Sequence, residues 1–221
     1  MSTQSHRSRR RVLVLTGALM LLRLANWANL AAGQGTSTPV GLMSGMAAAV
    51  TAAVKADPSL LNATGKRSDE ATRRFSDMYD VRVLPYIDFM RITALATGRS
   101  WRVATLDQQT QLARELRELI VSTDAVQECR QLAAPGLYDS PAFHTGDENA
   151  VVYFHPADRP QAVQAEFRVE LTPAGWKVMD IQLGGTWLVE SYKQVFAQQI
   201  ARVGIDGLIQ YLSDRNRALS N

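Results

Sequence analysis

The amino-acid sequence predicts an α+β fold, with a curved, mostly antiparallel sheet packed with N- and C-terminal helices around an apolar cavity. The first observation is a pair of strand-like runs, residues 162–171 and 176–183, joined by a Thr-Pro-Ala-Gly turn. The second is the helical spacing of apolar residues before and after this region. The chain has 221 residues, 46% of them hydrophobic, which fits one domain, alone or with a helical subdomain.

The sheet is expected over about residues 150–183, beginning with a short apolar strand at 150–155. Residues 162–171 alternate as a half-buried antiparallel strand does. The residues expected to share its apolar face are Val163, Ala165, Phe167, Val169 and Leu171. In the next strand the apolar phase changes between Val178 and Met179, so either the strand contains a bulge or both its faces are covered.

Helical spacing of apolar residues marks the segments before the sheet. We expect helices over residues 41–57, from Ser68 to about residue 80, and over about residues 87–98 with Asp88 as the N-cap. The best-marked helix begins at Thr105, where Thr105 and Gln108 form a capping box, and it is expected to run to about residue 130.

A further helix is expected after the sheet, from about Trp187 to Arg202. Gly204 fits the left-handed position that follows a helix end, and Asp206 begins a second helix to about residue 217. Residues 41–221 are thus predicted to form a single domain whose helical part covers about 41–130 and 187–217. Residues 133–149 are turn-rich, and the sequence assigns no strand there.

Residues 1–32 have the composition of a secretory signal peptide. A basic segment with Arg7, Arg9, Arg10 and Arg11 precedes the apolar run VLVLTGALMLL, which is too short to span a bilayer. The segment ending in Val12-Leu13 is also similar to a twin-arginine signal, so two export routes stay open. Residues 33–40 are rich in Gly, Ser, Thr and Pro, and are predicted to be a linker.

The positive net charge of the chain belongs to this signal segment. Residues 1–32 hold five arginines and no acid, so the remainder carries 19 basic and 21 acidic residues. The charge therefore does not indicate nucleic-acid binding. After export the protein is expected in the periplasm.

The sequence contains few residues arranged for catalysis or metal binding. His144 and His155 are too isolated to predict a metal site, and Cys129 is the only cysteine. Nucleotide-binding and hydrolase motifs are absent, so we expect no cofactor and no enzyme activity. Two alternatives stay open. One is a cone-shaped hydratase or isomerase that uses Asp180 or Asp88 as its base, and the other is an interaction module with an apolar face.

Two long blocks resemble the MlaC (toluene-tolerance auxiliary) family. Residues 83–120 contain Leu-Pro-Tyr-Ile-Asp-Phe, Gly-Arg-Ser-Trp and Ala-Thr-Leu-Asp-Gln, each similar to a family motif. In the second block, Met179-Asp180 is followed by Gly185-Thr186-Trp187-Leu188 and then by Gly204-Ile205-Asp206-Gly207-Leu208, in the family's order. The chain departs from the family at residues 133–149, where an edge strand is usual.

The resemblance implies a periplasmic phospholipid carrier that binds one or two lipid molecules. It also implies two partners: an inner-membrane ABC transporter complex and an outer-membrane lipoprotein-porin complex. The candidate lipid-binding residues lie on the apolar faces of the helices and strands. They are Leu84, Phe89, Leu116, Ile120, Phe167, Val169, Val178, Ile181, Leu188, Tyr192 and Phe196.

Overall fold

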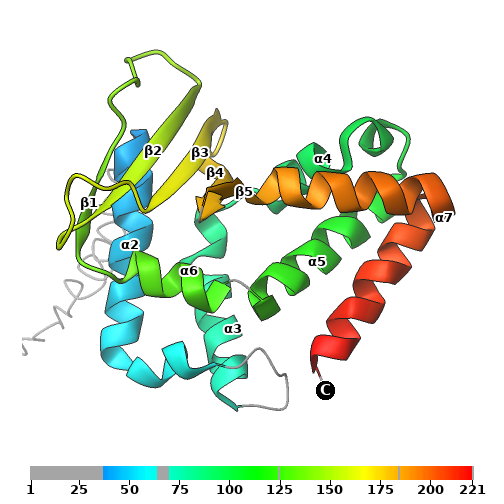
Figure 1. Cartoon of the computed structure of the whole chain (residues 1–221), viewed down its shortest axis with the longest axis horizontal. Helices are drawn as coiled ribbons and strands as arrows, with labels where there is room; N and C mark the ends of the chain where they lie inside the picture. The colour runs from blue at the N-terminus through cyan, green and yellow to red at the C-terminus, as the bar shows by residue number, and fades with distance from the viewer. Residues whose placement is uncertain (1–36, 64–69, 124, 184, 221) are drawn as a thin grey trace, which may run out of the picture. The chain divides into compact units, whose positions relative to one another are not determined.

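The computed structural model describes residues 37–63, 70–123, 125–183 and 185–220. The predicted signal peptide, most of the predicted linker and the predicted cap residue Ser68 lie outside the described residues. Helices and one sheet make up the described part (Figure 1), which confirms the α+β class.

Three helices precede the predicted capping box. They are α2 (Pro39–Ala56), α3 (Glu70–Arg82) and α4 (Phe89–Thr97), with the 3-10 turns η1 (Pro58–Asn62) and η2 (Leu84–Tyr86) between them. Helix α2 begins inside the predicted linker, because Pro39 occupies its first turn and the Thr38 hydroxyl accepts the Gly41 N–H at 3.0 Å. Asp88 caps α4 as predicted, since its Oδ1 accepts the Arg91 N–H at 2.9 Å.

The capping box at residue 105 is confirmed. The Gln108 N–H donates to Thr105 Oγ1 at 3.2 Å, and the Thr105 N–H donates to Gln108 Oε1 at 2.9 Å. Turn η3 (Gly98–Arg102) precedes it, and α5 (Leu106–Thr123) follows it. The prediction of one helix to about residue 130 is wrong, because a separate helix, α6 (Ala125–Leu132), follows α5. Helix α6 buries its apolar face in one apolar cluster, whereas α5 packs mainly in a second cluster and contributes Val121 to the first.

Five strands of the described chain form one antiparallel sheet in the order β1-β2-β3-β4-β5. They are β1 (Gly136–Asp139), β2 (Asn149–Pro156), β3 (Ala165–Thr172), β4 (Gly175–Leu183) and β5 (Thr186–Trp187). The sheet is therefore wider than the sequence indicated: β5 lies beyond the predicted end at residue 183, and β1 lies in the segment to which no strand was assigned. Its four residues are too few to show an alternating pattern.

The phase change in β4 is a bulge. Arg168 pairs with Asp180 while Val169 pairs with Val178, so Met179 has no partner on β3. The bulge places Val178, Met179 and Asp180 consecutively in buried positions. On β3, Ala165, Phe167 and Val169 are buried as predicted, whereas Val163 and Leu171 at the predicted strand's ends are 47% and 44% exposed.

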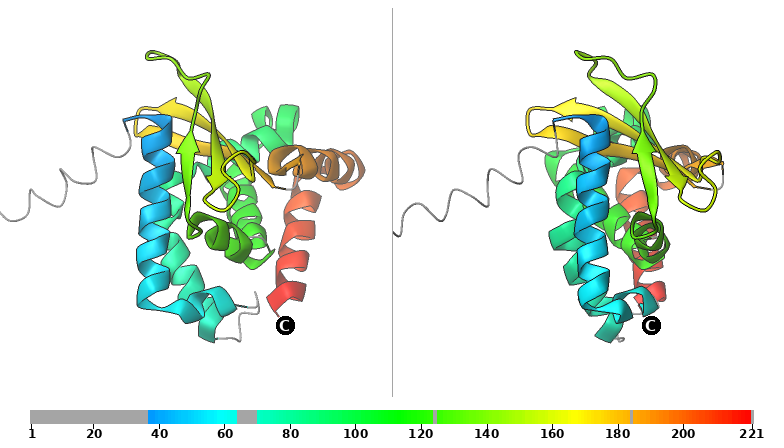
Figure 2. Two further views of the ribbon diagram at one scale, coloured as in Figure 1. Left: turned by 60° about the vertical axis from the view of Figure 1, so that its left-hand side comes forward. Right: turned by 90° about the vertical axis from the view of Figure 1, so that its left-hand side faces the viewer.

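The buried residues form two apolar clusters. The first, here called the sheet core, joins the inner face of the sheet to α2, α3 and α6. The second, here called the helical core, joins α4, α5 and α7 (Leu188–Ser220). Figure 2 shows α2 lying across one face of the sheet. This helix has the length and apolarity of a membrane span, but Leu42, Met43, Met46 and Val50 are buried in the sheet core.

Helix α7 bends at Gly204, where φ is 73° and ψ is −174°. Figure 1 shows its orange and red halves running in different directions. The predicted helix end at this glycine is thus confirmed as a bend that joins two helical halves. Both halves pack on α5: Phe196 from the first and Leu208 and Leu212 from the second are fully buried in the helical core.

Candidate functional site

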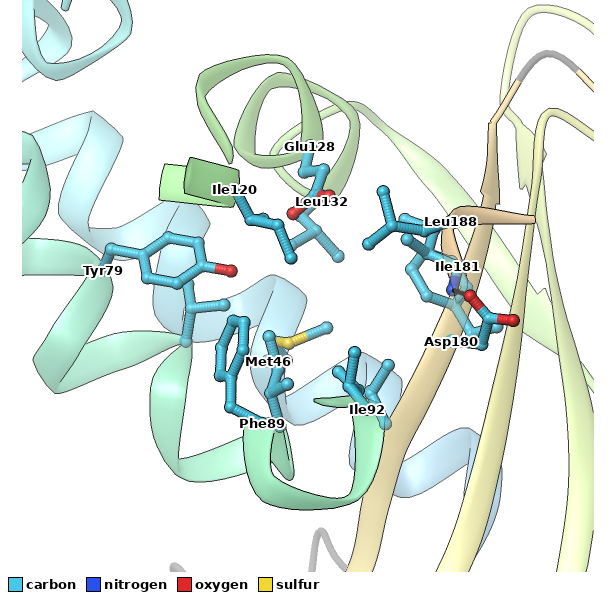
Figure 3. Close-up of a pocket in the computed structure, with 14 residues that line it drawn as sticks. Met46, Tyr79, Phe89, Ile92, Ile120, Glu128, Leu132, Asp180, Ile181 and Leu188 are labelled. Carbon is cyan, nitrogen blue, oxygen red and sulfur yellow. Dashed lines mark hydrogen bonds between the residues drawn. The ribbon is translucent and has the colours of Figure 1, made fainter. Parts of the chain in front are cut away.

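A cavity lies between the sheet core and the helical core. Fourteen residues line it, and nearly all are apolar (Figure 3). They are Met46, Tyr79, Val83, Ile87, Phe89, Ile92, Ile120, Glu128, Leu132, Phe167, Val178, Asp180, Ile181 and Leu188. We call this space the central cavity. Ile87 and Phe89 pack against both cores, so they lie where the two cores meet.

The central cavity encloses about 40 Å³. Pockets that hold drug-sized ligands measure roughly 300–1,000 Å³, so the side chains must separate before a large apolar ligand can enter. The lining makes such movement feasible, because it combines the unbranched, flexible Met46 side chain with residues of several different elements.

Tyr79 brings a polar group to this apolar lining. Its ring is fully buried on α3, and Figure 3 shows its hydroxyl directed toward the cavity. The hydroxyl has no hydrogen-bond partner among the described residues. Burial raises the pKa of Tyr79, and the Glu128 carboxylate on α6 raises it further. Tyr79 is therefore a neutral hydrogen-bond donor at physiological pH.

Asp180 joins β4 to the first turn of α7. Its Oδ1 accepts the Val189 N–H at 2.9 Å and the Ile181 N–H at 3.0 Å, while its Oδ2 lies 3.2 Å from Arg168 Nη1. Burial raises the pKa of Asp180, and these hydrogen bonds and the Arg168 guanidinium oppose that rise. The guanidinium also stacks 3.6 Å from the ring centroid of Trp187.

Both acids of the enzyme alternative have structural roles in this arrangement. Asp88 holds the start of α4, and Asp180 holds the start of α7. In the part of the chain that the structure describes, no group of three His, Cys, Asp or Glu residues is placed to hold a metal ion. Cys129 is buried in the sheet core, and burial raises the pKa of its thiol.

The structure divides the eleven candidate lipid-binding residues. Six line the central cavity: Phe89, Ile120, Phe167, Val178, Ile181 and Leu188. Leu116, Tyr192 and Phe196 belong to the helical core. Leu84 lines a surface groove beside α4, and Val169 is buried in the sheet core, next to a groove on the outer face of the sheet.

Apart from Asp180, which the enzyme alternative named, seven lining residues were not among the candidates. They are Met46, Tyr79, Val83, Ile87, Ile92, Glu128 and Leu132. Met46 and Tyr79 stand on apolar helix faces in the sequence, and that pattern alone does not tell a cavity wall from solid core. Glu128 is charged, so the apolar pattern could not select it; it lines the cavity because the fold brings α6 over it.

The family model of the MlaC protein matches residues 57–214. The chain belongs to the MlaC family. This match confirms the resemblance that the two sequence blocks indicated, and it extends over the residues between them. A comparison with curated proteins gave no match.

A solved structure is similar to this one over most of its length. It is the phospholipid-binding protein from Ralstonia solanacearum in complex with a phospholipid, which is 30% identical to this chain. The match covers 82% of this chain and 98% of that one, with a TM-score of 0.69. The similarity in structure agrees with the family assignment.

Proposed function

We propose that this protein binds phospholipid and carries it through the periplasm. Two observations support the proposal: the apolar central cavity and the likeness to a protein solved with a phospholipid bound. The ligand's acyl chains would lie between the sheet core and the helical core. The six candidate residues that line the cavity would contact the chains, together with Met46 and Leu132.

The energetics of a carrier explain why such a cavity is lined by hydrocarbon. Burying an acyl chain contributes about 0.8 kcal/mol per methylene relative to water, so two sixteen-carbon chains gain on the order of 20 kcal/mol. A bilayer offers the same gain, so the transfer of lipid between carrier and membrane stays near balance. The small volume of the cavity also favours release, because the unloaded protein regains its packing when the lipid departs.

We further propose the route that the family resemblance implies. The segment 1–32 would direct export, by the general or the twin-arginine pathway. In the periplasm the carrier would exchange lipid with an inner-membrane ABC transporter complex and an outer-membrane lipoprotein-porin complex. Export is tested by fusing residues 1–40 to alkaline phosphatase, an enzyme that becomes active only outside the cytoplasm. An inactive fusion contradicts export by the general pathway.

Lipid transfer between vesicles tests the carrier function. Donor vesicles contain a self-quenched fluorescent phospholipid, acceptor vesicles contain none, and the protein is added at increasing concentration. We expect the fluorescence to rise at a rate proportional to protein concentration. The Ile120→Lys variant places a charge in the cavity wall and should abolish transfer, whereas Val103→Lys, at a 77% exposed position, should not. Transfer at the protein-free rate contradicts the proposal.

A further inference from the structure

A second hollow adjoins the central cavity. It lies on the surface between η2, the start of α4, α5 and the β3–β4 hairpin, and it encloses about 450 Å³. We call it the hairpin groove. Its apolar lining includes Leu84, Met90 and Ala113. The sequence prediction included Leu84 as a lipid contact, but the structure places it here instead of in the central cavity.

Ile87 and Phe89 line both the hairpin groove and the central cavity. These two side chains therefore form the wall between the two spaces. Neither is fully buried, and Ile87 lies in the short connection between η2 and α4. Rotation of two side chains at a junction of two cores is a smaller change than the separation of packed helices, so this wall is a suitable passage for an acyl chain.

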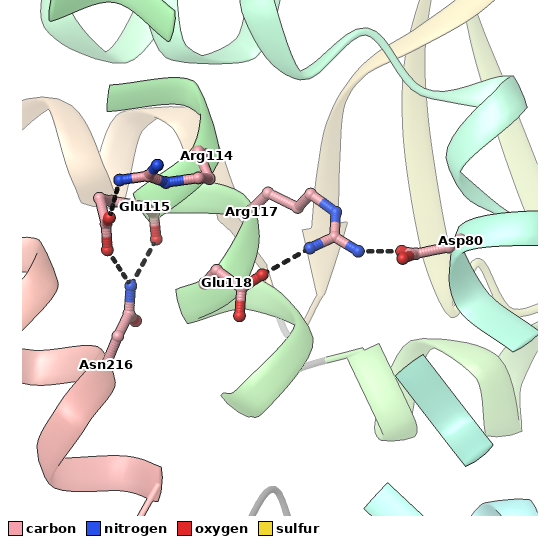
Figure 4. A network of polar contacts seen from close by, with 6 residues as sticks. All are labelled: Asp80, Arg114, Glu115, Arg117, Glu118 and Asn216. Carbon is pink, nitrogen blue, oxygen red and sulfur yellow. Dashed lines mark hydrogen bonds and ion pairs between the residues drawn. The ribbon is translucent and has the colours of Figure 1, made fainter. Parts of the chain in front are cut away.

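The rim of the hairpin groove carries three basic side chains, Arg114, Arg117 and Lys177, and one acid, Asp88. Arg114 lies 2.8 Å from a Glu115 oxygen, and Arg117 pairs with Asp80 and with Glu118 (Figure 4). Asp88 is engaged in capping α4. The two arginines thus have carboxylate partners already.

Lys177 is in a different situation. Its Nζ donates to the Pro85 carbonyl oxygen, a neutral acceptor, and among the described residues it has no ion pair with a carboxylate. Lys177 also lies close to the wall formed by Ile87 and Phe89. The next residue, Val178, lines the central cavity, and the Val178 carbonyl oxygen accepts the Asp88 N–H at 3.2 Å. The ammonium group of this half-buried residue is therefore held one residue from the passage, beside an apolar groove.

From this arrangement we infer that the hairpin groove is the entrance for the lipid and that Lys177 binds its phosphate group. The acyl chains pass between Ile87 and Phe89 into the central cavity, and the headgroup stays in the groove. The chemistry is complementary, because an anionic phosphate meets an ammonium group where the apolar passage begins. The inference rests on the proposed function and adds the position and the charge of the ligand's polar end.

The test compares two ligands that differ only in the phosphate-containing headgroup. Vesicles of dioleoylphosphatidylglycerol containing dioleoylglycerol are mixed with the protein, and the bound lipids are identified by native mass spectrometry. We expect Lys177→Glu to lower the captured ratio of phosphatidylglycerol to diacylglycerol by about 10-fold, the scale of a lost charge-assisted hydrogen bond. Lys193→Glu, the matched charge reversal on α7, should leave the ratio unchanged.

Lys177→Met guards against misfolding, because it keeps the aliphatic stem and removes only the charge and the exposed hydrogen bond to Pro85. It should lower the same ratio while the thermal unfolding curve stays that of the wild type. A ratio that neither Lys177 variant changes overturns the assignment of Lys177. If the wild type captures neither lipid, the proposed function and this inference both fail.

A binding experiment with inorganic phosphate alone distinguishes a lipid headgroup from free phosphate as the ligand of Lys177. If phosphate binding depends on Lys177 while the lipid ratio is unchanged in the Lys177 variants, the groove is a free-phosphate site and the headgroup role is overturned.

The entrance itself is tested by a bulky label. Cys129 is fully buried, so a maleimide should react with an introduced thiol only, and unmodified wild type checks this. Met90→Cys places the label in the hairpin groove, and Val103→Cys places it on a remote exposed site. We expect the first label to slow lipid capture about 10-fold relative to the second. Equal capture rates contradict the assignment of this groove as the entrance.

Discussion

Asp180 Oδ1 accepts the backbone N–H of Val189 at 2.9 Å, and this bond ties the bulged strand β4 to the first turn of α7. The two residues belong to different parts of the fold, Asp180 to strand β4 and Val189 to the helical core. The carboxylate therefore lies at the boundary between the two cores, as the central cavity does.

This placement predicts a pH-dependent contribution to stability. Because burial raises the pKa of Asp180 above its ordinary value of 3.8, the folded state holds this proton more tightly than the unfolded state. The contribution is fully present below about pH 3.8 and is lost as pH rises through the raised pKa. Asp180→Asn should lack this step, so the difference in urea-unfolding free energy between variant and wild type should change across this pH range. Parallel stability curves across this pH range contradict the prediction.

A matched pair of variants separates the hydrogen bond from the charge. Asp180→Asn retains an oxygen that can accept the Val189 N–H, whereas Asp180→Ala leaves the Val189 and Ile181 N–H groups without this acceptor. We expect Asp180→Ala to be less stable than Asp180→Asn by about 1–3 kcal/mol at neutral pH. Equal stability of the two variants would show that the bond to Val189 contributes nothing.

The Tyr79 hydroxyl is expected to lower stability. It is fully buried and has no hydrogen-bond partner among the described residues, so folding removes it from water without replacement. Tyr79→Phe should therefore raise the free energy of unfolding by about 1 kcal/mol, measured by urea titration of delipidated protein. Tyr138→Phe is the control variant, because Tyr138 on β1 is partly exposed; it should change the free energy of unfolding by a smaller amount. Destabilisation by Tyr79→Phe contradicts the account.

Asn216 holds the second half of α7 on α5. Its Nδ2 donates to the Glu115 carbonyl oxygen and to Glu115 Oε2, both at 2.9 Å, in a buried position (Figure 4). Asn216→Ala should lower the free energy of unfolding by about 2–3 kcal/mol, because a buried carboxylate loses a donor. Gln210→Ala removes an exposed hydrogen bond to Asp214 and is the control, with a change below about 0.5 kcal/mol. Similar losses in both variants would refute the role of Asn216.

The bend of α7 depends on Gly204. Its φ of 73° and ψ of −174° lie in a region that is essentially restricted to glycine. Gly204→Ala should cost about 1–3 kcal/mol in chemical denaturation, although a new methyl group would meet no atom within 4 Å. Ala201→Gly, one turn earlier, should cost about 1 kcal/mol or less. A neutral Gly204→Ala substitution would mean that the second half of α7 moves freely.

The sequence predicted local features well, because their causes are local. The capping box of Thr105 and Gln108, the Asp88 cap and the positive φ of Gly204 each depend on a few neighbouring residues. The phase change in residues 176–183 also predicted the bulge at Met179 correctly as one of two options. The family resemblance and the α+β class rest on longer patterns, and both are confirmed.

The features that the sequence did not predict depend on distant contacts. The separate helix α6 packs in the sheet core, while α5 packs mainly in the helical core. Strand β1 is defined by its pairing with β2, which hydrophobic alternation over four residues cannot indicate. Leu116 and Ile120 stand on one apolar face of α5, yet only Ile120 lines the central cavity. An apolar pattern predicts that a side chain is buried, but it does not distinguish a cavity-lining residue from a residue of the solid core.

The most direct test of the phospholipid-carrier proposal is native mass spectrometry of protein purified from a periplasmic fraction without detergent, followed by lipid extraction. We predict a mass excess equal to one or two phospholipids, which disappears on organic extraction and matches the extracted lipid. The Ile120→Lys variant should give the mass of the protein alone. A wild-type protein without added mass, and unchanged after incubation with liposomes, would contradict the proposal that the central cavity holds lipid.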